Sequence, residues 1–167
     1  NGAHTGEVTA SMLKSVGVSY CIVGHSERRK LGETNETIVE KIRSLIKNKI
    51  TPILCVGEKI RGQDGEHFEE IASMLTASIN GIPKKQLSSM VLAYEPLWAI
   101  STENNGAMDP EIIHETIIYL KKVLNDLLGK KIADTVRIIY GGSVDAKNSN
   151  DIITKGRAEG FLVGKAS

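Results

Sequence analysis

Cysteine is scarce in this sequence, and its two cysteines, Cys21 and Cys55, form no pattern that would bind a metal ion. Each lies inside a short apolar run, where a free thiol behaves as a small hydrophobic side chain. We therefore interpret both as buried thiols rather than as a disulfide or a redox pair, and we expect no metal site. Unpaired thiols are typical of proteins in the reducing cytoplasm, which is the location we expect.

Long apolar runs and clusters of basic residues are also absent. No hydrophobic segment approaches the roughly 20 residues of a membrane-spanning helix, and the amino end has no signal-peptide pattern. The 21 Lys and Arg residues nearly balance the 20 Asp and Glu residues and are scattered along the chain, whereas a nucleic-acid surface needs a basic stripe. We expect neither a membrane nor a nucleic-acid partner.

No linker or low-complexity tract divides the 167 residues. The composition is 41% hydrophobic and 25% charged, which is ordinary for a globular protein. We therefore expect residues 1–167 to form one domain with a sizeable core.

Short apolar runs alternate with amphipathic helical patterns. Five runs are rich in Val, Ile and Leu and lack polar alternation, as do parallel strands that are covered on both faces; they are residues 19–23, 50–56, 90–94, 136–140 and 160–163. Helices are predicted near residues 9–15 and 146–154 and over residues 34–47, 66–80 and 110–128. Asp109 offers an N-cap for the longest helix, and Gly129 ends it.

This alternation fits either a doubly wound sheet or a β/α barrel. A dinucleotide-binding doubly wound domain has a Gly-x-Gly-x-x-Gly turn after a strand, and this sequence has none. Polar segments instead follow three predicted strands, at residues 24–29 (GHSERR), 93–100 (AYEPLWAI) and 140–144 (YGGSV). The loops after the strands form the active face of a β/α barrel, so we favour a barrel that carries its chemistry on that rim.

His25 follows an apolar run and directly precedes a predicted helix start at Ser26. Backbone amides at a helix start disfavour a charged imidazole, so we expect a neutral ring that donates a hydrogen bond. The alternative is a polar loop residue at the surface.

Glu95 ends a predicted strand immediately before Pro96, which keeps Glu95 out of the helical conformation. Leu97 and Trp98 can exclude water from its carboxylate, and such desolvation raises the affinity for a proton. This environment suits a general base. The alternative is a strand-end glutamate paired with a lysine.

Two glycine-rich turns, at residues 141–143 (GGS) and 164–167 (GKAS), each follow a predicted strand. Backbone amides in such turns can converge on a phosphate, and barrels often bind one after their last two strands. Each turn alone could be only a tight connection.

These segments, together with residues 2–7 (GAHTGE), 53–58 (ILCVGE) and 160–164 (GFLVG), resemble the triosephosphate isomerase family through nearly the whole chain. The family interconverts dihydroxyacetone phosphate and glyceraldehyde 3-phosphate in glycolysis without a cofactor. The resemblance implies that His25 polarises the substrate carbonyl, Glu95 shuttles the proton and Glu27 is a supporting carboxylate. It also implies phosphate contacts, which map to Ser101, Ser143, Gly164 and Lys165.

The sequence also departs from the family pattern. The family's first three strands, its closing helix and its catalytic lysine have no counterpart in the 167 residues, and residues 101–106 (STENNG) replace the family's Gly-Thr-Gly-Lys lid. Five strands cannot close an eight-stranded ring. We therefore expect a partial TIM-type (β/α) barrel that is closed or covered by self-association as a homo-oligomer, with a weaker lid and with weak or no isomerase activity alone.

Two alternatives stay open. The chain could be one half of a split isomerase, completed by a second chain that carries the missing strands. It could also be a non-catalytic phosphate-binding or assembly module, in which Ser143, Gly164 and Lys165 bind an anion while Glu95 is idle.

Overall fold

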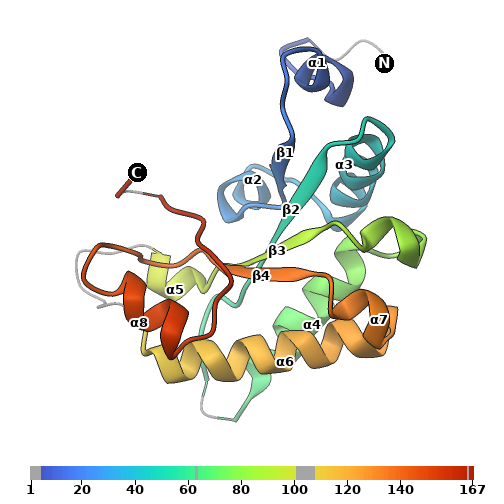
Figure 1. Cartoon of the computed structure of the whole chain (residues 1–167). Coiled ribbons are helices and arrows are strands. Elements are labelled where there is room, and N and C mark those ends of the chain that lie inside the picture. Colours follow the sequence, from blue (N-terminus) through green and yellow to red (C-terminus); the bar gives the residue numbers. More distant parts are fainter. Residues whose placement is uncertain (1–4, 63, 101–107, 165) are drawn as a thin grey trace.

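A parallel sheet of four strands organises the structure. The computed structural model describes residues 5–62, 64–100, 108–164 and 166–167. The strands are β1 (Tyr20–Val23), β2 (Thr51–Val56), β3 (Val91–Tyr94) and β4 (Arg137–Tyr140). They lie side by side in the order in which they occur in the chain (Figure 1). The predicted α/β class and parallel sheet are therefore confirmed, and the sheet is consistent with part of a β/α barrel.

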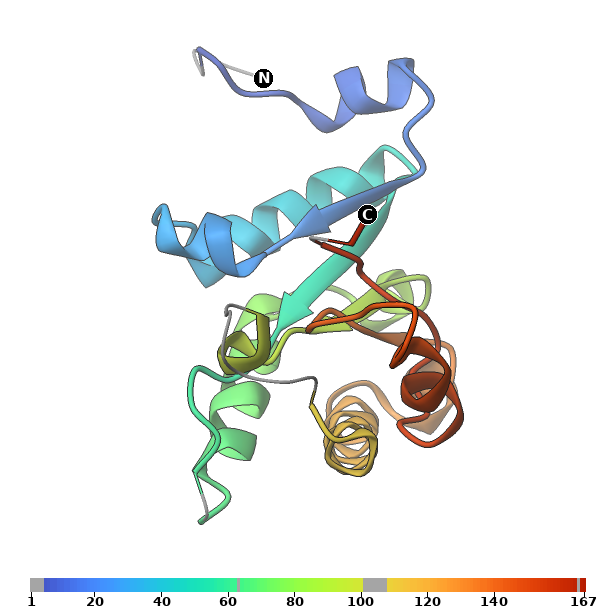
Figure 2. The same ribbon diagram turned by 90° about the vertical axis from the view of Figure 1, so that its left-hand side faces the viewer.

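Helices follow and cover the strands. They are α1 (Ala10–Ser15), α2 (Ser26–Lys30), α3 (Asn35–Lys47), α4 (Glu66–Ser78), α5 (Leu97–Ile100), α6 (Pro110–Leu128), α7 (Lys130–Ala133) and α8 (Ser149–Thr154), with a 3-10 turn η1 at Lys84–Leu87. Helix α3 packs on β1 and β2, and α4 packs on β2 and between α3 and α6. In two views α1 lies beyond β1, apart from the other helices (Figures 1 and 2).

The two faces of the sheet differ in burial. Leu54, Leu92 and Ile138 occupy neighbouring register positions and are fully buried toward the helices. At the alternate positions of β1, Tyr20 is 52% exposed and Ile22 is 45% exposed. The helix side therefore holds the hydrophobic core, while the β1 end of the opposite side, here called the inner side, is open.

The predicted fifth strand is not formed as a strand. Residues 160–163 contribute one parallel bridge between Phe161 and Tyr140. The Tyr140 N–H donates to the Gly160 carbonyl at 3.0 Å, and the Leu162 N–H donates to the Tyr140 carbonyl at 2.9 Å. Within the described chain no further strand pairs with its other edge, and Val163 is 41% exposed.

The long helices and the short helix α1 match the sequence prediction, whereas α8 begins later than predicted. Asp109 caps α6 by accepting a hydrogen bond from the Glu111 N–H at 2.9 Å, and Gly129 follows its end, as predicted. Helix α8 begins later than expected because the Asp145 side chain accepts the N–H groups of Lys147 and Asn148, which holds them in a turn.

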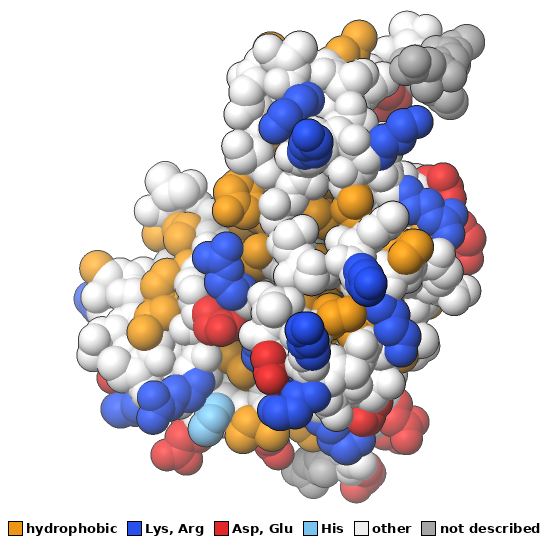
Figure 3. All heavy atoms as spheres, turned by 45° about the vertical axis from the view of Figure 1, so that its right-hand side comes forward, with side chains coloured by type: hydrophobic (Ala, Val, Ile, Leu, Met, Phe, Trp, Pro, Cys, Tyr) orange, Lys and Arg blue, Asp and Glu red, His pale blue; other side chains and the backbone are white. Residues whose placement is uncertain are grey.

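Charge is mixed over the surface. On the face shown in Figure 3, Lys and Arg side chains are interspersed with Asp and Glu, and hydrophobic side chains lie between them. None of the described helices combines the length and the apolar character required to cross a bilayer.

Candidate active site

The carboxyl ends of β1, β3 and β4 bring three predicted site residues to one cavity. His25 follows β1, Glu95 follows β3 and Ser143 lies in the turn after β4, and all three line a cavity of about 720 Å³. Gly164, from the segment that bridges β4, lines it as well. The expectation that these segments share one rim is therefore met for the residues that the structure describes.

His25 and Glu95 form the centre of this cavity. The Nε2 atom of His25 lies 3.1 Å from the Oε1 atom of Glu95. The Glu95 side chain is only 3% exposed, while that of His25 is 28% exposed. A buried carboxylate and a more accessible imidazole are thus close enough to act on the same small molecule.

Backbone contacts decide how the His25 ring is protonated. The ring is the N-cap of α2, and its Nδ1 atom accepts a hydrogen bond from the Glu27 N–H at 3.3 Å. An acceptor nitrogen carries no proton, so the hydrogen-bonding pattern assigns the ring proton to Nε2. The Nε2–H group therefore lies on the side of the ring next to Glu95.

Burial sets the proton affinity of Glu95. Desolvation raises the pKa of its carboxyl group above the ordinary value of 4.5, against smaller opposing contributions from His25, the Cys55 thiol and the Ser26 backbone. Its Oε1 atom is buried and accepts no well-oriented hydrogen bond from the described part of the protein. A carboxylate oxygen that is poorly solvated and unsatisfied is suited to accept a proton from a substrate.

Two glycines make room for Glu95. A Cβ atom at Gly57, just after β2, would lie 1.9 Å from the Glu95 carbonyl oxygen. A Cβ atom at Gly141 would lie 2.9 Å from the Glu95 Cγ atom. The role of Gly57 was not predicted, because the close approach of β2 to β3 becomes visible only in three dimensions. The available signal was a glycine directly after a strand.

Glu27 contributes to the site mainly through its backbone. Its side chain is 81% exposed, and its Oε2 atom lies 3.9 Å from the Nδ1 atom of His25. The shorter contact is the Glu27 N–H that holds the ring. The structure thus places Glu27 at the rim of the cavity, as an orienting residue for His25.

The predicted phosphate contacts are described only in part. Ser143 and Gly164 line the cavity from two different segments, together with Gly142. Ser101 and Lys165 lie outside the described residues, as does the altered lid segment at 101–106.

A buried polar cluster next to the site was missed by the sequence analysis. Glu58 is fully buried and accepts hydrogen bonds from the Tyr94 hydroxyl at 3.0 Å and the Trp98 Nε1 at 2.8 Å. Arg61 lies 3.7 Å from the same carboxylate oxygen. This cluster ties α5, which directly follows Glu95, to the end of β2. The signal was the glutamate in residues 53–58, which follows an apolar strand as Glu95 does.

The described residues contain no group of three or more His, Cys, Asp or Glu side chains arranged to hold a metal ion. The groups described at this cavity include the carboxylate of Glu95, the imidazole of His25 and the backbone amides of the turn at Ser143.

Comparison with known proteins identifies relatives along the whole chain. The family model described as triosephosphate isomerase matches residues 1–167. A triosephosphate isomerase of Alkaliphilus oremlandii is 40% identical over 169 residues, which cover 100% of this chain and 67% of the relative. The enzyme of Thermus thermophilus is 44% identical and that of Streptococcus mutans 42%, each covering 99% of this chain and 66% of the relative. The chain spans about two thirds of the length of these relatives.

Proposed function

Because this chain belongs to the triosephosphate isomerase family, we propose that its cavity binds a phosphorylated triose and interconverts dihydroxyacetone phosphate and glyceraldehyde 3-phosphate. The observation that carries the proposal is the 3.1 Å approach of the His25 Nε2 atom to the buried carboxylate of Glu95. The reaction needs no cofactor, since a base and a hydrogen-bond donor suffice to move a proton between adjacent carbons.

The proposed mechanism divides the work between these two side chains. Glu95 removes a proton from the carbon beside the substrate carbonyl, and the electron pair moves toward the carbonyl oxygen. The His25 Nε2–H group donates a hydrogen bond to that oxygen and stabilises its developing charge. The His25 Nε2 atom then gives its proton to this oxygen and takes up the proton of the neighbouring hydroxyl group. Glu95 returns its proton to the former carbonyl carbon, which converts the ketose to the aldose and regenerates both side chains.

We place the substrate phosphate at the other end of the cavity. The backbone amides near Ser143 and Gly164, which line the cavity, are suited to bind an anion. Ser101 and Lys165 complete the proposed phosphate contacts. The unpaired thiols of Cys21 and Cys55 support a cytoplasmic location for this reaction.

We propose that the 167 residues by themselves turn over slowly or not at all. The family's catalytic lysine, which stabilises the negative charge of substrate and intermediate, has no counterpart among them. Loss of one preorganised charge or donor lowers the rate by about a hundred- to a thousandfold.

The 167-residue protein also presents a surface suited to self-association. The outer edge of β1 pairs with no described strand, and Tyr20 and Ile22 are half exposed on the inner side. A bare strand edge with apolar side chains favours pairing with another chain. We propose that a second copy covers this edge; a separate chain that completes the barrel is the alternative partner.

Proton exchange tests the proposed chemistry with more sensitivity than net turnover. Dihydroxyacetone phosphate is incubated with the protein in deuterated water, and loss of its carbon-bound proton is followed by NMR. We expect exchange above the buffer rate, and at least a hundredfold less with Glu95→Gln. Glu69→Gln, an exposed carboxylate on α4, is the matched control. If exchange is absent, or persists in Glu95→Gln, the results favour the alternative function, a non-catalytic anion-binding module.

A further inference from the structure

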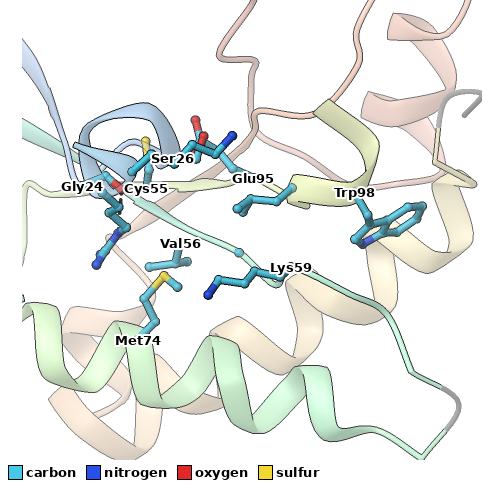
Figure 4. Close-up of a pocket in the computed structure, with 12 residues that line it drawn as sticks. Gly24, Ser26, Cys55, Val56, Lys59, Met74, Glu95 and Trp98 are labelled. Carbon is cyan, nitrogen blue, oxygen red and sulfur yellow. Dashed lines mark hydrogen bonds between the residues drawn. The ribbon is translucent and has the colours of Figure 1, made fainter. Parts of the chain in front are cut away.

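A second cavity, of about 590 Å³, shares Glu95 with the proposed active site but contains neither His25 nor Ser143 in its lining. It lies where the ends of β1 and β2 meet α2, α4 and α5, and Figure 4 shows its lining residues. The proposed isomerisation makes no use of this space.

The walls of this cavity are mostly apolar. Val56, at the end of β2, lies near Met74, on α4, in Figure 4. Leu97 and Trp98, on α5, also line the cavity. The Trp98 indole is held in place because its Nε1 atom donates to the buried Glu58 carboxylate at 2.8 Å. The fixed indole of Trp98 and the flexible thioether of Met74 line different parts of this cavity, and each offers a surface on which an apolar group can pack.

Positive charge lines the same cavity. Lys30, at the end of α2, and Lys59, just after β2, are both exposed lining residues. Neither ammonium group forms an ion pair with another described residue. In Figure 4 the Lys59 side chain extends toward Met74. Both ammonium groups are therefore available to a ligand.

Arg29 adds a third cation that is fixed in the wall. Its guanidinium donates to the Gly24 carbonyl, to Asn35 and to Ser78, at 2.8 to 3.0 Å. These bonds hold its charge in position while the two lysines remain free to move toward an anion.

We propose that this cavity is a binding site for an amphiphilic anion, a molecule with a flat apolar body and one carboxylate or phosphate group. The apolar body packs between Trp98 and Met74, and the anionic group lies between Lys30 and Lys59. The proposal does not depend on the isomerase function, because it uses a different set of side chains for binding.

Trp98 makes the proposal directly measurable, since it is the only tryptophan in the chain. We choose para-nitrobenzoate as the probe, because a nitroaromatic ring quenches indole fluorescence on contact. Its neutral counterpart, para-nitrobenzamide, has the same ring without the charge. We expect saturable quenching by the anion, at least about fivefold tighter than by the amide, and weakened by added salt.

Variants that each remove one positive charge test where the anion binds. Lys30→Gln and Lys59→Gln should each weaken binding by about threefold to fivefold, and the double variant by more than tenfold. Lys84→Gln, an exposed lysine in η1, should leave it unchanged. These residues are at the surface, so the folded state is expected to persist, and near-ultraviolet circular dichroism verifies it.

One further variant tests which of the two cavities binds the probe. Ser143→Asp adds a negative charge to the cavity that contains His25, and it should not alter quenching by para-nitrobenzoate. Three results would each overturn the proposal: quenching that rises linearly without saturation, equal affinity for the acid and the amide, or a loss of binding caused by Ser143→Asp and not by the lysine variants.

Discussion

The buried carboxyl group of Glu95 couples chemistry to stability. Burial raises its pKa in the folded protein above the ordinary value of 4.5. Glu95 keeps the ordinary pKa in the unfolded chain and has the raised pKa in the folded protein. At pH values between the two, the folded state binds more protons than the unfolded state. The free energy of unfolding therefore decreases as pH rises through this interval. The property that makes Glu95 a base is thus one that makes the folded protein less stable at neutral pH.

Glu95→Gln is expected to stabilise the protein in a pH-dependent way. The amide resembles the protonated acid in shape and carries no charge. The melting temperature of the variant should therefore be a few degrees higher at neutral pH, because each kcal/mol of added unfolding free energy raises it by about 2–4 °C. Below pH 4.5 the advantage should vanish, since the parent carboxyl is then protonated in both states. Thermal unfolding across this pH range measures the effect, and Glu69→Gln on the exposed surface of α4 should show no such trend. A constant difference at every pH would contradict the assigned cause.

Position along the chain predicted that His25 and Glu95 lie at one edge of the sheet, while their proposed roles came from the family resemblance. His25 and Glu95 each follow an apolar strand, and parallel strands deliver such residues to one edge. Lys30, Lys59 and Gly57 were not predicted as functional, because their roles depend on which elements become neighbours in space.

Among the elements, β2 and β3 meet unusually closely at the site. The Glu95 N–H donates to the Val56 carbonyl at 2.8 Å, and the next residue after Val56 is Gly57, whose α-carbon faces the Glu95 backbone. This contact continues the strand pairing past the end of the ladder. It fixes the base of the Glu95 side chain relative to β2.

Gly57→Ala should disrupt this contact. Its Cβ atom would lie 1.9 Å from a backbone oxygen, so the two strand ends must separate. Overpacking of this kind costs about 1–3 kcal/mol or more, and the shift should also lower proton exchange by moving Glu95. Chemical denaturation measures the first effect and NMR the second. Gly62→Ala is the matched control, because a Cβ atom there contacts nothing within 4 Å; equal effects of the two variants would refute the assignment.

Elements with a strong internal pattern were predictable, and those that depend on neighbours were not. Helices α3 and α6 carry apolar stripes and side-chain caps, which local sequence encodes. Helices α5 and α7 are four residues long, too short for a periodic pattern. The run at 160–163 reads as a strand, yet strand formation requires partners that sequence composition does not report.

The two sides of the sheet are buried to different extents. The helix side is closed over a continuous core, whereas the β1 end of the inner side leaves Tyr20 and Ile22 half exposed. A third cavity, of about 520 Å³, lies along β1 between α1 and α3. Open space, exposed apolar side chains and a strand edge that no described strand pairs with therefore coincide at one end of the sheet.

Tyr20→Lys should weaken self-association. A charge on this edge strand opposes pairing with a second copy, so the mass measured by light scattering should fall toward that of one chain, 18.1 kDa. Ile118→Lys is the matched control, because Ile118 is 58% exposed on α6, away from β1. A parent protein that remains a single copy at high concentration would end the proposal of self-association.

The agreement between spatial and sequential strand order has a consequence for biosynthesis. A nascent polypeptide leaving the ribosome can add each strand to the one made just before it, without waiting for distant segments. Pairing consecutive strands closes shorter loops than pairing distant ones, which lowers the entropic cost of each step. Glu95 leaves the ribosome 70 positions after His25, so the reactive pair is assembled only after β2 has joined β1 and β3.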